Sequence, residues 1–228
     1  MSKAIIKILR ECREFLTIFL PFATINVYYS TSLHMLSSGD ALTAPRIVLG
    51  IDPGTNLLGY GIIKVTAGHV ELLGLGVVRL GKITDAGEKL HHIYEKIGGL
   101  IDGFEATEVA IEAPFFGKNV QSMLKLGRAQ GVAIAAAMQT GLSVTEYAPK
   151  KVKQSITGNG NASKDQVWQM LQRTLQIEVK PQYFDATDAL AVALCHYYQS
   201  SSPLAAASGK GFKGWDDFIA KNPGKIKL

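Results

Sequence analysis

The sequence predicts an α/β fold in which helices flank one mixed central sheet. Three apolar runs of strand length come first, each bounded by glycine, proline or asparagine. A longer segment with apolar residues at helical spacing follows, and then another short apolar run, which gives the order β-β-β-α-β. The chain has 228 residues, of which 47% are hydrophobic. This length and composition suit one well-buried α/β domain with appendages.

The three expected strands cover residues 47–51, 60–65 and 71–78. Their isoleucine, valine and leucine content favours a buried sheet, and we expect the three to pair as successive antiparallel strands. The helix expected next covers residues 88–104, and the strand after it covers 108–112 and ends in an acid. We expect this strand and the one that follows to be parallel members of the same sheet.

The second half of the chain predicts further helices around one more strand. A helix rich in alanine and glycine is expected over 122–140, where small residues allow close packing against a sheet or another subunit. A strand over 144–148 and a lysine-rich helix over 149–156 follow. Ser163 and Gln166 have the spacing of a capping box and open a helix that contains Trp168. The last expected core helix covers 186–198.

The two ends of the chain differ from this core, so we expect one domain over residues 46–199 with an extension on each side. The apolar stretch 15–25 is interrupted by Pro21 and is too short to span a membrane, which needs roughly 20 apolar residues. Residues 1–45 are therefore expected outside the fold, either as a disordered tail or because translation starts nearer Arg46. Residues 200–228 are expected to form a flexible basic tail.

Charge and cysteine content narrow the class of protein only slightly. A formal charge of +5 is compatible with a polyanionic partner, but many proteins that never contact DNA carry a similar excess. The only two cysteines, Cys12 and Cys195, have no spacing typical of a disulfide framework or a zinc site, so the protein is expected in the reducing cytoplasm. Cys195 lies in an apolar run and is expected to be a core residue.

Four acids stand where chemistry is expected. Asp52 and Glu112 each end an apolar strand, and Asp185 and Asp188 are three residues apart at the start of a helix, on one face. Each acid alone has an ordinary structural explanation as a turn cap, a solvated strand end or a partner of the helix dipole. Together they would crowd like charges that a hard divalent cation could hold, so the set predicts a Mg²⁺ or Mn²⁺ site.

Separated motifs carry a resemblance to a known family. They are GIDPGT (50–55), GYG (59–61), AIE (110–112), KN (118–119), LKLG (124–127), GVAI (131–134), YA (147–148), VKQ (152–154) and DATDALA (185–191). In order and register they resemble the RuvC family of Holliday junction resolvases, the crossover junction endodeoxyribonucleases. The resemblance covers about residues 46–199.

This resemblance implies an RNase H-like fold and a homodimer that nicks two opposed strands of a four-way junction in DNA recombination and repair. It implies that Asp52, Glu112, Asp185 and Asp188 are the catalytic metal ligands. Two Mg²⁺ ions per subunit are expected, with Mn²⁺ able to substitute. A branch-migration helicase complex is the protein partner that the family suggests.

The resemblance also suggests DNA contacts near the acids. Phe115 matches the family's base-stacking position, and Lys153 and Lys164 match positions that hold phosphate or support the active site. The expected DNA-binding set is Phe115, Lys118, Asn119, Arg128, Lys153 and Lys164. Core packing of the aromatic ring and solvated helix faces for the cations are the structural alternatives.

Two other functions are open to the same residues. An ATP-binding protein of the sugar-kinase and heat-shock ATPase class also places Asp, Gly and Thr after a first strand. That class needs two lobes and a second phosphate loop, for which the remaining sequence offers no glycine-rich repeat. A junction-binding module without catalytic activity would keep the basic residues but lose acids, whereas all four acids are present here.

Overall fold

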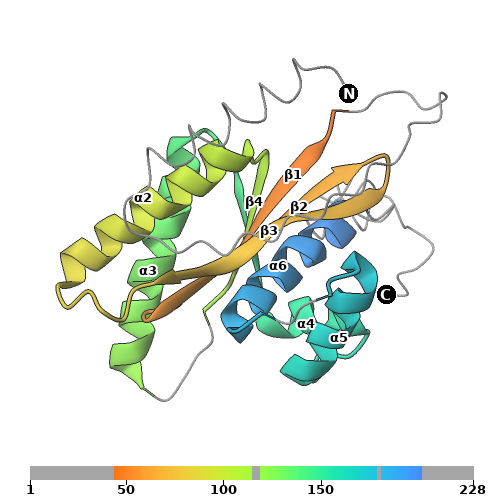
Figure 1. Cartoon of the computed structure of the whole chain (residues 1–228). Coiled ribbons are helices and arrows are strands. Elements are labelled where there is room, and N and C mark those ends of the chain that lie inside the picture. The colour runs from red at the N-terminus through yellow and green to blue at the C-terminus, as the bar shows by residue number, and fades with distance from the viewer. Residues whose placement is uncertain (1–43, 115–118, 179–180, 202–228) are drawn as a thin grey trace, which may run out of the picture.

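The computed structural model describes residues 44–114, 119–178 and 181–201, which form a five-stranded sheet with helices on both faces (Figure 1). The expected extension 1–45 and basic tail 200–228 lie almost entirely outside the described residues. Phe115 and Lys118 also lie outside them. No helix in the described ranges is long and apolar enough to cross a membrane.

The strands run in the order β3-β2-β1-β4-β5 across the sheet. The strands β1 (Arg46–Asp52), β2 (Leu57–Thr66) and β3 (His69–Arg79) form successive antiparallel pairs. The strand β4 (Glu108–Glu112) pairs in parallel with β1, and β5 (Val144–Tyr147) pairs in parallel with β4. The expected mixed sheet is therefore confirmed, with each strand within three residues of its predicted ends.

Two layers of helices enclose the sheet. The helices α2 (Ala86–Phe104) and α3 (Val120–Gln139) cover one face, where side chains such as Leu49, Ile51 and Ile97 form one buried core. The helices α4 (Pro149–Thr157), α5 (Lys164–Leu175) and α6 (Phe184–Ser200) cover the other face (Figure 1). A second core lies there and contains Trp168 and Cys195, which confirms the prediction that Cys195 is a core residue.

Close contact between α6 and the sheet depends on small residues on both sides. A Cβ atom on Gly50 would lie 2.2 Å from the carbonyl oxygen of Ala189, and one on Gly61 would lie 2.5 Å from Cα of Leu190. Neither distance is compatible with a side chain, so only glycine lets α6 lie this deep. The depth of α6 matters because this helix carries two of the four acids.

The helix ends follow the expected capping chemistry. Ser163 accepts a hydrogen bond from the amide of Gln166, and the Gln166 side chain accepts one from the amide of Ser163, so the predicted capping box is confirmed. The helix α6 begins at Phe184, two residues before the predicted start, which places Asp185 inside its first turn. A negative charge there is favoured by the helix dipole.

Candidate active site

Asp52 and Glu112 lie side by side at one edge of the sheet. Asp52 is the last residue of β1 and Glu112 is the last residue of β4. The parallel register pairs Ile51 with Ile111, so the two acids occupy the next position on neighbouring strands. Alternation along the strands places both side chains on the face that α6 covers. The prediction that both acids end strands is confirmed.

Asp185 and Asp188 reach the same edge from the first turn of α6. Gly59 pairs with Asp52 across the β1–β2 ladder, and a Cβ atom on Gly59 would lie 1.9 Å from the carbonyl oxygen of Asp185. The backbone of α6 thus rests directly on the strand beside Asp52. This contact gathers acids from three distant parts of the sequence at one end of the helix.

The gathered carboxylates perturb one another strongly. Burial raises the pKa of Asp52 to about 8, and the negative charges of Glu112, Asp188 and Asp185 add to the effect. Burial, with the charge of Asp188, raises the pKa of Glu112 to about 7. Burial also raises the pKa of Asp188 despite a neighbouring lysine. Such shifts typify functional clusters of acids, where a bound cation would compete with protons.

The donor set fits a hard divalent cation. Its interacting groups are partly buried carboxylates whose negative charges repel one another, and carboxylate oxygens are the ligands that Mg²⁺ and Mn²⁺ prefer. Among the described residues, however, no three acidic, histidine or cysteine side chains already form a closed cage around one point.

Two lysines approach the acids from the side of α4 and α5. Lys164 Nζ donates a hydrogen bond to Asp188 Oδ2 at 2.5 Å. Burial lowers the pKa of Lys164, but the bond to Asp188 and the charges of Asp52 and Asp185 raise it on balance. Lys153, on α4, lowers the pKa of Glu112 and of Asp188, which places it within electrostatic reach of both. The structure therefore places both lysines beside the acids.

The other expected DNA contacts are less closely tied to the acids. Asn119 caps α3 by accepting a hydrogen bond from the amide of Ser122 at 3.1 Å, a structural role that was not predicted from the sequence. Arg128 is exposed on α3, and no interaction within the described ranges ties it to the acidic cluster. Lys89 of α2 was not singled out, yet its ammonium group donates to the carbonyl of Thr55 at 3.0 Å and holds the loop that follows Asp52.

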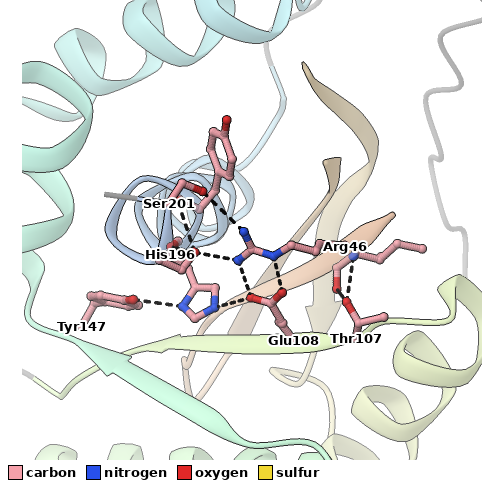
Figure 2. A network of polar contacts seen from close by, with 9 residues as sticks. Arg46, Thr107, Glu108, Tyr147, His196 and Ser201 are labelled. Atoms are coloured by element: carbon pink, nitrogen blue, oxygen red, sulfur yellow. Dashed lines mark hydrogen bonds and ion pairs between the residues drawn. The ribbon is translucent and has the colours of Figure 1, made fainter. Parts of the chain in front are cut away.

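A polar network at the opposite end of α6 was also missed (Figure 2). Arg46 Nε and Nη2 donate to Glu108 Oε1 and Oε2 at 2.6 and 2.8 Å. Glu108 Oε2 lies 2.8 Å from His196 Nε2, and His196 Nδ1 lies 2.9 Å from Tyr147 Oη. The bond from Arg46 is the main reason that the pKa of Glu108 is lowered. These contacts join β1, β4, β5 and α6.

One sequence signal could have revealed the role of His196. It is seven residues after Ala189 and three after Ala193, so it shares the helix face that rests on the sheet. The structure accordingly buries this histidine to 8% exposure.

The strand order of this mixed sheet is that of the RNase H-like fold. With acids at adjacent strand ends and on the helix that crosses them, the protein belongs to the RNase H-like class of nucleases. The chain is a member of the RuvC family, since the family described as Crossover junction endodeoxyribonuclease RuvC matches residues 48–196. Membership of this family implies a divalent metal cofactor. The ATP-binding alternative loses its support, because the described residues form one such sheet and not two lobes.

Relatives with similar sequences match most of this chain. The Crossover junction endodeoxyribonuclease RuvC of Porphyromonas gingivalis is 54% identical over 185 residues, which are 80% of this chain and 97% of the relative. That of Bacteroides fragilis is 53% identical over 184 residues, or 80% of this chain and 96% of the relative.

Solved structures agree with the sequence relatives. The structure of Thermus thermophilus RuvC has 33% identity and a TM-score of 0.62, and the match covers 68% of this chain and 95% of that one. A structure of T. thermophilus RuvC in complex with Holliday junction substrate has 30% identity and a TM-score of 0.61, with 68% and 94% of the two chains covered.

Proposed function

We propose that this protein is a structure-selective endonuclease that resolves four-way (Holliday) DNA junctions by paired, metal-dependent phosphodiester hydrolysis in recombination and repair. The observation that carries the proposal is the convergence of Asp52, Glu112, Asp185 and Asp188 at one end of α6, beside Lys164. The RuvC relative solved with a Holliday junction substrate supports the choice of DNA structure.

In this proposal the four acids hold Mg²⁺, with two ions per subunit and Mn²⁺ as a possible substitute. Bound ions would activate the attacking water and stabilise the leaving oxygen of the phosphodiester. The ammonium group of Lys164 donates a hydrogen bond to Asp188 Oδ2, and this bond fixes the orientation of the carboxylate. Lys153 and Lys164 add the positive charge that a phosphate needs to approach a cluster of acids.

The remaining DNA contacts follow from the family resemblance. Phe115 would stack on a base at the junction centre, and Lys118 and Arg128 would contact the DNA backbone beside it. Asn119 would hydrogen-bond either the backbone or a base. The exposed position of Arg128 on α3 supports its part.

A homodimer is part of the proposal because two opposed cuts need two sites. The outer surface of α3 supports it. Val120 is 64% exposed, Leu124 is 54% exposed and Met138 is 62% exposed, and helical geometry places all three on one stripe. Gly127 and Gly131 lie on this stripe, and a Cβ atom on either would meet nothing within 4 Å. A second copy of α3 could therefore approach closely along this surface.

The remaining expectations are kept as proposals. We propose a cytoplasmic protein that works with a branch-migration helicase complex. We further propose that residues 1–45 extend outside the nuclease domain 46–199 and that residues 200–228 form a basic tail.

The first test is cleavage of a labelled four-way junction and a matching linear duplex, with Mg²⁺ or with EDTA, resolved on a denaturing gel. Paired nicks near the branch point that need metal and are absent from the duplex are expected. Tight junction binding without any cleavage would contradict the enzyme and favour the noncutting junction-binding module.

Asp52→Asn should abolish cleavage while leaving junction affinity within about twofold, because it removes a metal-ligand charge but none of the basic surface. Gel-shift titration and the cleavage assay measure the two properties separately. Loss of binding together with cleavage would contradict this separation of roles.

A further inference from the structure

Arg79 lies at the end of β3, on the face of the sheet that carries the acidic site. It is the last residue of β3 and pairs with Leu57, while Val77, two residues earlier, pairs with Gly59. Gly59 in turn pairs with Asp52. Directly paired residues point to the same face, so Arg79 points to the face on which Asp52 and α6 lie. Strand spacing and rise place its Cα about 12 Å from that of Asp52.

The guanidinium group of Arg79 is fixed on an aromatic platform. Its Cζ atom lies 5.5 Å from the ring centroid of Tyr183. Tyr183 is the N-cap residue of α6 and precedes Asp185 by two residues. The platform is therefore part of the same turn that delivers the acids to the site.

Arg79 keeps its donors available for another partner. The side chain is exposed, and within the described ranges no carboxylate forms an ion pair with it. An arginine that lies on a ring directs its N–H groups outward in its own plane, and that planar fork matches a phosphate. Holding the group in place also reduces the entropy lost when a phosphate binds.

We propose that Arg79, held on Tyr183, binds a backbone phosphate of the DNA strand that enters the acidic site. This inference rests on the proposed nuclease function. Lys153 and Lys164 bind the strand on the α4–α5 side of the acids, and Arg79 binds it on the β3 side. Positive groups on both sides keep the strand across the carboxylates, which would otherwise repel it.

The test is junction affinity of the full chain at a series of KCl concentrations in EDTA. Arg79→Gln is expected to lower the slope of log K against log salt by about one, as the loss of one phosphate contact requires. Arg79→Lys keeps the charge and should keep the slope. Tyr183→Leu removes the platform and should weaken binding severalfold, with a smaller change in slope. An unchanged slope for Arg79→Gln would overturn the inference.

Two controls separate this contact from other effects. Lys96→Gln removes one charge from α2, on the opposite face of the sheet, and should leave the slope unchanged. Mn²⁺ binding measured by electron paramagnetic resonance should be the same in Arg79→Gln and the parent, because Arg79 does not touch the acids. Loss of Mn²⁺ binding would show that Arg79 acts through the acids and would contradict the proposal. A parent protein that fails to cut junctions would refute the proposed function, whereas an unchanged slope in an active parent refutes this inference alone.

Discussion

Among the residues that the structure describes, Asp52 is the carboxyl group whose pKa departs furthest from its ordinary value. Its pKa rises from 3.8 to about 8 in the fold, mainly because it is buried and secondly because Glu112, Asp188 and Asp185 lie near it. Between these two values the folded protein binds a proton that the unfolded chain does not bind. The stability of the parent protein in EDTA should therefore fall as pH rises through this window.

Asp52→Asn should remove this pH-dependent loss of stability. In EDTA, the melting temperature of the variant should exceed that of the parent by an amount that grows from about pH 5 to about pH 8 and then levels off, as linkage requires. Differential scanning calorimetry across this range measures the effect. Asp102→Asn, at an exposed position on α2, is the matched control and should show no such growth. An advantage that is the same at every pH would contradict the argument.

At the scale of elements, the active site depends on how deeply α6 rests on β1 and β2. The sequence predicted that Asp52 and Glu112 end strands and that Asp185 and Asp188 begin a helix, because each feature is local. It did not predict what brings the three segments together. Gly59 touches the backbone of Asp185, which is more than a hundred positions further along the chain, and no spacing pattern records such a contact.

Gly59→Ala should weaken metal binding although it replaces none of the four acids. The added methyl group must push the first turn of α6 away, at a cost on the order of 1–3 kcal/mol of stability. Gly61→Ala should cost a similar amount, since its Cβ would meet Leu190 one turn further along. Mn²⁺ titration by calorimetry should show a larger loss for Gly59→Ala. Equal losses for both variants would mean that the position of the first turn is not what matters.

The network at the other end of α6 holds the same helix by polar contacts. Arg46 and Glu108 are far apart in sequence, and each looks like an ordinary charged residue at a strand start, so sequence reasoning could not pair them. The bond from Arg46 lowers the pKa of Glu108, and burial only partly opposes this. An acid with a lowered pKa stabilises the fold above its unfolded value and loses that contribution as pH falls through its folded value.

Glu108→Gln should therefore cost about 1 kcal/mol at pH 7, a modest value because the pair is partly solvated. The difference from the parent should shrink as pH falls below about 4.5, the ordinary pKa of the group. Urea unfolding at pH 7, 5 and 3.5 measures it. A difference that persists unchanged at pH 3.5 would assign the loss to packing rather than to charge.

At the scale of the whole molecule, the apolar stripe on α3 (Val120, Leu124 and Met138) is exposed within the part of the chain that the structure describes. Leu124→Glu places a charge in its middle and should convert a dimer to a monomer, because burying an unpaired charge costs several kcal/mol. Light scattering measures the mass, and cleavage should change from paired to single nicks. Gln121→Glu adds the same charge at a neighbouring exposed position and should remain dimeric. A parent protein that is already monomeric would contradict the dimer.

The close contact between α6 and the sheet determines which substitutions the protein can tolerate. At Gly50, Gly59 and Gly61 the helix leaves no room for a single carbon atom beyond the backbone. In a complete substitution scan scored by survival of DNA damage, these three positions should tolerate as little change as the four acids do, although none of them touches a substrate. Intolerance in such a scan would therefore not identify catalytic residues by itself. Scoring the abundance of each variant separately would distinguish the two groups, because the acid variants should accumulate and the glycine variants should not.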